Sequence, residues 1–147
     1  MSPMFPISPI SLMSLISPIR PMRLITLIGL IGLAACSQLS QEQQAALAAE
    51  GFYSHLVAGE YELFLEGKAG ADSLPGSYRE QLLEGYQQFM DKQQRAHGGI
   101  REVRVSNARK DTLTDYTTVL LLLCYGDSTQ EEIVVPMVEH NGRWRMR

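Results

Sequence analysis

The chain contains few of the residues that build metal, nucleotide or disulfide-rich sites. Its 147 residues include two cysteines, three histidines and one tryptophan. No cluster of histidines, cysteines and acids has the spacing of a metal site, and there is no glycine-rich phosphate loop. No serine sits in a nucleophile elbow. The sequence therefore predicts neither a metal ion nor a cofactor, and it favours a protein without catalytic activity.

Positive charge is also scarce. The whole chain carries 13 basic and 16 acidic residues. Residues 1–35 contain two arginines and no acid, so the remainder has 11 basic against 16 acidic residues and a net charge of −5. An acidic domain is a poor partner for nucleic acid, and it is not held at anionic lipid by its overall charge.

The first 35 residues have the layout of a secretory signal. Arg20 and Arg23 form a positive flank, and residues 24–33 form an apolar core of ten residues. That core is too short for a bilayer, which needs about 20 residues, and five upstream prolines prevent its extension as a helix. The sequence therefore predicts an export signal over residues 1–35 and not a transmembrane anchor.

The segment before the signal core is of low complexity. Residues 1–21 consist mostly of Met, Ser, Pro, Ile and Leu, and the motif ISPI occurs twice. The stretch from Met22 to Cys36 is already a complete leader. We therefore hypothesise that translation begins at Met22 and that residues 1–21 are not translated.

The cysteine at the end of the signal has a specific resemblance. Leu33-Ala34-Ala35-Cys36 resembles the lipobox of bacterial lipoproteins, in which the thiol receives a diacylglyceryl group and the chain is cut before the cysteine. Acyl chains on Cys36 would then hold the protein at a membrane through a tether over residues 36–41. The alternative is an ordinary signal peptide whose cleavage site happens to precede a cysteine.

The resemblance also implies a location. Ser37 follows Cys36, and no aspartate occupies that position. By similarity to lipoprotein sorting in Gram-negative bacteria, this implies a lipid-anchored protein of the cell envelope, held in the outer membrane. The side of that membrane on which the domain lies stays open.

The second cysteine, Cys124, lies in the apolar stretch VLLLLCY. A disulfide with Cys36 is one interpretation, because exported proteins form disulfides. We favour the other, in which Cys124 is a small core residue.

The first half of the domain has helical patterns. Ser40 to Gln43 and Ser77 to Glu80 match capping boxes, and each is followed by apolar residues at helical spacing. The first helix is expected to end at Gly59 and the last at about His97, before Gly98-Gly99, with a short helix over Glu60–Glu66 between them.

In the second half of the domain, apolar and polar residues alternate, as they do in β-strands. The expected strands span residues 100–107, 115–125, 129–140 and 143–147, and the second of them is apolar on both faces. Pro136 predicts a bulge or an edge position, and Asn141-Gly142 predicts a hairpin turn. In the last strand, Trp144 and Met146 are expected to face inward.

These elements predict an α+β fold over residues 42–147, with N-terminal helices packed on a curved four-stranded antiparallel sheet. The order resembles the nuclear-transport-factor-2-like (NTF2-like, cystatin-like) superfamily. More narrowly, FYSHLVAGEYELFLEG, YREQLLEGYQQF, HGGIREVRV and YGDSTQEEIVVPMVEHNGRW resemble a domain-of-unknown-function family of small envelope lipoproteins, related to lumazine-binding-like domains. The resemblance implies a cone whose mouth holds a ligand or a catalytic site, and a homodimer formed through the sheets.

Aromatic side chains are the candidates for lining such a pocket. A small hydrophobic ligand would contact them, although aromatics at this spacing are also typical of a core. An envelope protein is the other partner we consider. The candidates are Phe52, Tyr53, Tyr61, Phe64, Tyr86, Tyr125 and Trp144.

Two further sets of residues could carry a function. An isomerase- or hydrolase-like enzyme is the alternative function, and it would draw on the three histidines and acids such as Glu62, Asp115 and Glu139. Arg143 and Arg145 could contact an anion. Alternatively, they form a solvated face that pairs across strands with Glu131 and Glu132.

Overall fold

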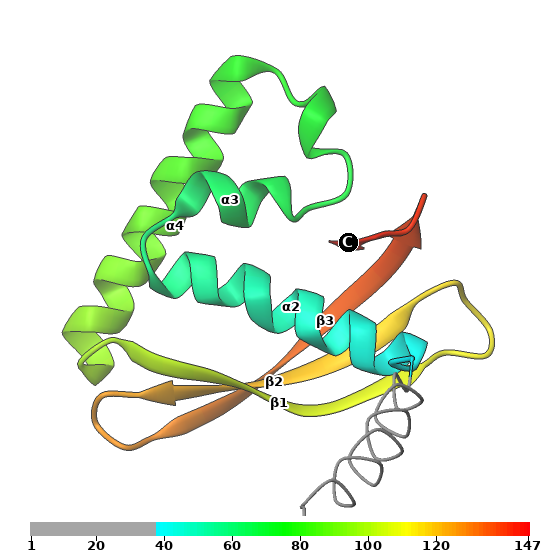
Figure 1. Cartoon of the computed structure of the whole chain (residues 1–147). Helices are drawn as coiled ribbons and strands as arrows, with labels where there is room; N and C mark the ends of the chain where they lie inside the picture. The colour runs from blue at the N-terminus through cyan, green and yellow to red at the C-terminus, as the bar shows by residue number, and fades with distance from the viewer. Residues whose placement is uncertain (1–37) are drawn as a thin grey trace, which may run out of the picture. The chain divides into compact units, whose positions relative to one another are not determined.

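The computed structural model describes residues 38–147 (Figure 1). Three helices come first, followed by a four-stranded sheet, and Leu39–Arg147 forms one compact unit. The predicted signal sequence, the hypothetical start at Met22 and the lipobox cysteine Cys36 lie outside the described residues. The elements are α2 (Gln41–Val57), α3 (Tyr61–Glu66), a short 3-10 helix (Ala71–Ser73), α4 (Gly76–His97), β1 (Ile100–Lys110), β2 (Thr117–Tyr125), β3 (Gln130–His140) and β4 (Arg143–Met146).

The predicted capping box at the start of α2 is confirmed. Ser40 Oγ accepts from the backbone N–H of Gln43 at 3.2 Å, and the Gln43 side chain accepts from the Ser40 N–H at 2.9 Å. Both contacts satisfy donors that a helix start leaves free. The small residues Ala45 and Ala49 are fully buried, so α2 approaches the sheet closely.

The predicted start of α4 is wrong by two residues, because a capping box at Ser77 would begin the helix at Tyr78, and the predicted cap is wrong as well. The helix begins at Gly76 with Pro75 as the N-cap residue, and no side chain caps it. Ser77 already lies in the first turn. Proline holds its φ near −59° without strain, so it ends the preceding extended segment just before the helix. The predicted end at His97 is confirmed, with Gly98 in the left-handed region at φ 73°.

The sheet is an antiparallel meander in the order β1-β2-β3-β4. All three helices lie on one of its faces (Figure 1). On that face β2 buries Val119, Leu121 and Leu123 completely or nearly so. On the other face Leu120 and Leu122 are only half-buried, because no described helix covers them. The expectation that β2 is buried on both faces is therefore wrong for Leu120 and Leu122, although Cys124, at the end of the same face, is buried.

Pro136 lies at a local edge and not in a bulge. The pairing of β2 with β3 runs through Pro136 without a register shift, and the β3–β4 ladder begins one residue later, at Met137. The Pro136 carbonyl accepts from the Arg147 N–H at 2.9 Å, so the backbone of this residue faces the β4 side. The missing proline N–H therefore removes no bond from the ladder.

The helices do not all pack on the sheet in the same way. α2 contacts all four strands, whereas α4 contacts β1 near its own C-terminal end. α4 has no fully buried residue, although it is the longest described helix. It rises away from the sheet along most of its length (Figure 1). This arrangement leaves room between α4 and the strands.

None of the helices in residues 38–147 combines the length and the apolar character needed to cross a membrane.

Candidate functional site

A groove of about 490 Å³ opens where α4 stands away from the sheet. Its walls come from the C-terminal half of α2, from α3, from the middle of α4, and from β2 and β3. The apolar part of its lining includes Leu56, Leu82, Phe89, Leu123 and Ile133. We call this feature the α4 groove. Apolar walls with a small number of polar groups are typical of small-molecule sites.

Three aromatic rings from three helices meet in the α4 groove. Phe64 lies edge-on to Tyr53, with ring centroids 5.2 Å apart, and edge-on to Tyr86, with centroids 4.9 Å apart. Edge-to-face pairs are favourable arrangements for aromatic rings. They fix α3 between α2 and α4, and so they hold the helical walls of the groove in place.

Lys68 is the cation of the α4 groove. Its Nζ lies 5.7 Å from the centroid of the Phe64 ring, and burial lowers the pKa of its ammonium below the ordinary value. It takes part in none of the ion pairs found among residues 38–147. A half-buried ammonium beside apolar walls is suited to contact an anionic group on a bound molecule.

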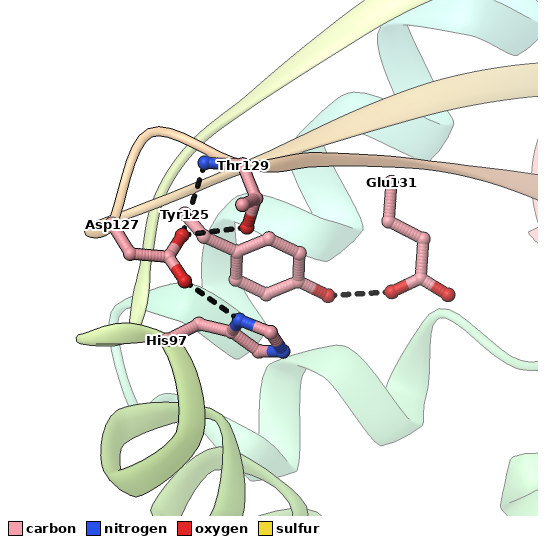
Figure 2. Close-up of polar contacts among 5 residues, drawn as sticks. All are labelled: His97, Tyr125, Asp127, Thr129 and Glu131. Carbon is pink, nitrogen blue, oxygen red and sulfur yellow. Dashed lines mark hydrogen bonds and ion pairs between the residues drawn. The ribbon is translucent and has the colours of Figure 1, made fainter.

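Glu131 is the carboxylate of the α4 groove, and Tyr125 orients it (Figure 2). The Tyr125 hydroxyl donates to Glu131 Oε2 at 2.7 Å. Burial, followed by this hydrogen bond, raises the pKa of Tyr125 to about 12, so the tyrosine keeps its proton. Glu131 Oε1 remains able to accept from a ligand.

A second polar cluster lies beside Tyr125, at the junction of α4 with the β2–β3 turn (Figure 2). Asp127 Oδ1 accepts from the hydroxyl and the N–H of Thr129, and its Oδ2 lies 2.9 Å from His97 Nδ1. These contacts, that of the Thr129 hydroxyl first, lower the pKa of Asp127 to about 2. The His97 ring lies 4.7 Å from the Tyr125 ring. The cluster joins the end of α4 to the strands that carry Glu131.

The structure brings only some of the predicted aromatics to the groove. Tyr53, Phe64 and Tyr86 line it, and Tyr125 is buried beside it and contacts Glu131. The other three, Phe52, Tyr61 and Trp144, are absent from its lining.

Each of these three has another neighbour. Phe52 packs so closely on Gly67 that a Cβ there would lie 2.5 Å from its ring. Tyr61 lies with Leu63 and Leu83 in a shallow depression. Trp144 packs against the core, and its Nε1 is buried without a hydrogen-bond partner among the described residues.

The predicted cross-strand pairing of the β4 arginines with Glu131 and Glu132 is wrong. Arg143 lies opposite His140 and Arg145 opposite Val138, because the β3–β4 ladder covers only the last part of β3. Both arginines line a second, wider groove of about 840 Å³. Its lining also contains Asp72, Asp115, Glu139 and His140, so the site carries both signs of charge. Because the lining carries both signs of charge, this groove shows no preference for an anionic ligand.

The remaining acid–base candidates do not reach the α4 groove. His55 pairs with Glu60, His97 with Asp127, and Glu62 with Arg79. Within residues 38–147, no three histidines, cysteines or acids are grouped as metal ligands. Cys124 is buried in β2, as expected for a small core residue. The described lining of the α4 groove thus has one carboxylate and no histidine.

Sequence reasoning missed both charged residues of the α4 groove. A signal for Glu131 existed, because it alternates with Ile133, Val135 and Met137, which are apolar residues on the helix-facing side of β3. Because Glu131 comes first among these alternating residues of β3, its charge indicates a polar site on the sheet face that the helices cover. Lys68 carried no such signal, since it lies in a loop whose path depends on the fold.

Comparisons with known proteins support the fold. No family model matches the sequence, and no curated protein matches it. A crystal structure from Campylobacter jejuni, described as an NTF2-like transpeptidase, matches with a TM-score of 0.54 and 11% sequence identity. The match covers 67% of this chain and 92% of that chain. At this identity the similarity concerns the fold alone, and it shows that the chain has an NTF2-like α+β fold.

Proposed function

We propose that the protein is a non-catalytic binding protein whose α4 groove takes a small, largely apolar molecule with an anionic group. The observation that carries this proposal is Lys68, a half-buried ammonium at an apolar groove with no ion-pair partner among the described residues. The aromatic and aliphatic walls would hold the body of the molecule. Glu131 Oε1 would accept a hydrogen bond from a donor on it.

We also propose that the domain is anchored in the cell envelope by acyl chains on Cys36. The support comes from the sequence, namely the positive flank, the short apolar core and the Leu-Ala-Ala-Cys box. Ser37 favours the outer membrane of a Gram-negative bacterium. We retain the domain-of-unknown-function lipoprotein family as part of this proposal.

A homodimer is a further proposal. The sheet face without helices exposes Val134 at 64%, next to the half-buried Leu120. A second copy or another envelope protein would cover these side chains. Sedimentation of the purified protein distinguishes a dimer from a monomer.

The alternative function is a small enzyme that uses the same groove. Glu131 favours it, because it is a carboxylate held by a buried tyrosine at the exposed edge of a largely apolar groove. General acid–base catalysis needs a proton donor as well as an acceptor, and the described lining offers no histidine or second carboxylate as partner. We therefore place binding before catalysis.

Two fluorescent probes test the binding proposal. Anilinonaphthalene sulfonate is apolar and anionic, whereas N-phenylnaphthylamine is apolar and neutral. Lys68→Met keeps the apolar stem and removes the charge. We expect it to weaken binding of the sulfonate roughly tenfold, since a hydrogen bond to a charged group contributes about 1.5 kcal/mol, and to leave the neutral probe unchanged.

Lys92→Met is the matched control, because Lys92 lies exposed on α4 and does not line the groove. It should leave the affinity for both probes unchanged. Equal sulfonate affinity in the wild type and Lys68→Met would contradict the role of Lys68.

A further inference from the structure

Exposed apolar side chains gather around the start of the described domain. Leu39, just before α2, and Leu47, in the first half of α2, are 47% and 55% exposed, and Val105 of β1 is 37% exposed. They line a shallow depression together with Ala46. Solvated leucines on adjacent elements are typical of a contact surface.

A fourth apolar side chain lies at the same end of the domain. Leu113, in the loop between β1 and β2, is 92% exposed. Lys110 Nζ donates to Gln41 Oε1 at 3.0 Å, which joins the last residue of β1 to the first residue of α2. In Figure 1 this loop (yellow) and the start of α2 (cyan) accordingly lie at one end of the sheet.

The loop is built so that Leu113 projects outward. Asp111 Oδ1 accepts from the Leu113 N–H and its Oδ2 from the Thr114 hydroxyl, both at 2.9 Å. The Asp111 N–H donates to the Tyr116 carbonyl, also at 2.9 Å. These bonds satisfy polar groups of the loop, and the Leu113 side chain takes no part in them. The loop therefore presents Leu113 to solvent at the same end of the domain as Leu39 and Leu47.

We propose that this end of the domain rests on the membrane surface, with Leu39, Leu47 and Leu113 in the interfacial layer of the bilayer. The inference rests on the proposed lipidation of Cys36. Leu39 follows Cys36 by three residues, a reach of at most about 11 Å. Acyl chains on Cys36 would therefore hold Leu39 close to the bilayer surface. Leu47 lines the same depression as Leu39, and the loop of Leu113 lies at the same end of the domain.

The chemistry around the leucines fits a bilayer surface. Arg104 and Glu50 line the depression, and Arg104 Nε lies 3.2 Å from Glu102 Oε2. Lys110 lies beside the start of α2, where it contacts Gln41. Long basic side chains can cover apolar surface while their charges stay among lipid headgroups. The depression and the α4 groove share no lining residue, so a domain seated in this way keeps its groove accessible.

The test uses the full chain, purified from membranes and reconstituted in vesicles of phosphatidylethanolamine and phosphatidylglycerol. Leu113→Cys is labelled with a polarity-sensitive bimane. Val134→Cys, on the uncovered sheet face, is the matched control. Cys124 is replaced by alanine in both. We expect a blue shift and quenching by nitroxide-labelled lipids at position 113, and no quenching by lipid at position 134, where a second copy of the chain would cover the label.

Denaturing mass spectrometry of the same samples separates the possible failures. A chain with a diacylglyceryl mass on Cys36 but no lipid quenching at position 113 would overturn this inference alone. So would quenching at position 134 instead, or a blue shift without lipid quenching, which indicates a protein partner. A chain without that mass would overturn the lipid anchor and this inference together.

Discussion

At the scale of single residues, two buried polar atoms of the described domain have no hydrogen-bond partner there. They are the hydroxyl of Tyr86, which lines the α4 groove, and Nε1 of Trp144, which packs against the core. A buried donor without a partner costs about 1–3 kcal/mol relative to a solvated one. The aromatic rings at these positions thus contribute to packing, whereas their unpaired polar atoms lower the stability of the domain.

Tyr86→Phe should raise the free energy of unfolding by about 1 kcal/mol, because it removes the unpaired hydroxyl and keeps the ring that packs on Phe64. Urea denaturation of the ligand-free protein measures this. Tyr78→Phe, at an exposed position of the same helix, is the control and should change little. A clear loss of stability in Tyr86→Phe would mean that the hydroxyl is paired.

Asp127 makes stability depend on pH in the acid range. Contacts with Thr129 and His97 lower its folded-state pKa to about 2, from an ordinary value near 3.8. The unfolded chain therefore takes up this proton at a higher pH than the folded chain does. The stabilisation is fully present above about pH 4 and is lost as the pH falls toward about 2.

Asp127→Asn should therefore lower stability at neutral pH and flatten its loss between about pH 4 and 2, compared with the wild type. Urea denaturation across that range measures the difference between the two proteins. Asp91→Asn, on an exposed part of α4, should leave the curve of the wild type unchanged. Parallel curves for Asp127→Asn and the wild type would refute the assignment.

At the scale of elements, the end of α4 is fixed to the β2–β3 turn. The Gly126 N–H donates to the Gly99 carbonyl and the Asp127 N–H to the His97 carbonyl, both at 2.8 Å. Gly126 and Gly98 are so close that a Cβ on Gly126 would lie 2.4 Å from the Gly98 carbonyl oxygen. Since the rest of α4 stands off the sheet, this junction sets where the groove wall lies.

Gly126→Ala should destabilise the domain by about 1–3 kcal/mol, because the methyl group meets backbone that cannot move without shifting α4. It should also weaken binding of anilinonaphthalene sulfonate. Gly51→Ala is the control, since a Cβ there meets nothing within 4 Å inside α2. We expect that change to add about 0.5–1 kcal/mol of stability. Urea denaturation that ranks both variants as equally stable would contradict the close approach.

Element boundaries were predictable where one residue decides them. Ser40 caps α2, and Gly98 and Asn141 adopt positive φ where a helix or a hairpin must turn. The start of α4 was not predictable in this way, because Ser77 matches a capping box while Pro75 already fixes the backbone. Two signals competed within three residues, and the covalent constraint of proline prevailed over a hydrogen bond.

At the scale of the whole molecule, the fold followed from periodicity and the groove did not. Strand alternation predicted the meander, and the NTF2-like structural match agrees with it. The groove depends on how far α4 stands from the sheet and on the register that places Glu131 opposite Leu123. Neither quantity is local in sequence. The spacing of apolar residues on α4 could predict an apolar face of the helix, but not that this face would line a groove instead of packing on the sheet.

Native mass spectrometry of the full-length protein, released from envelope membranes in mild detergent, tests the central claim most directly. Denaturing spectra of the same sample separate covalent acyl mass from bound ligand. Gly85→Phe is the matched variant, because Gly85 lines the groove and has open space where a side chain would project. The account predicts a non-covalent small molecule on the wild type and none on Gly85→Phe. A bare wild-type protein, or a molecule that persists in Gly85→Phe, would contradict it.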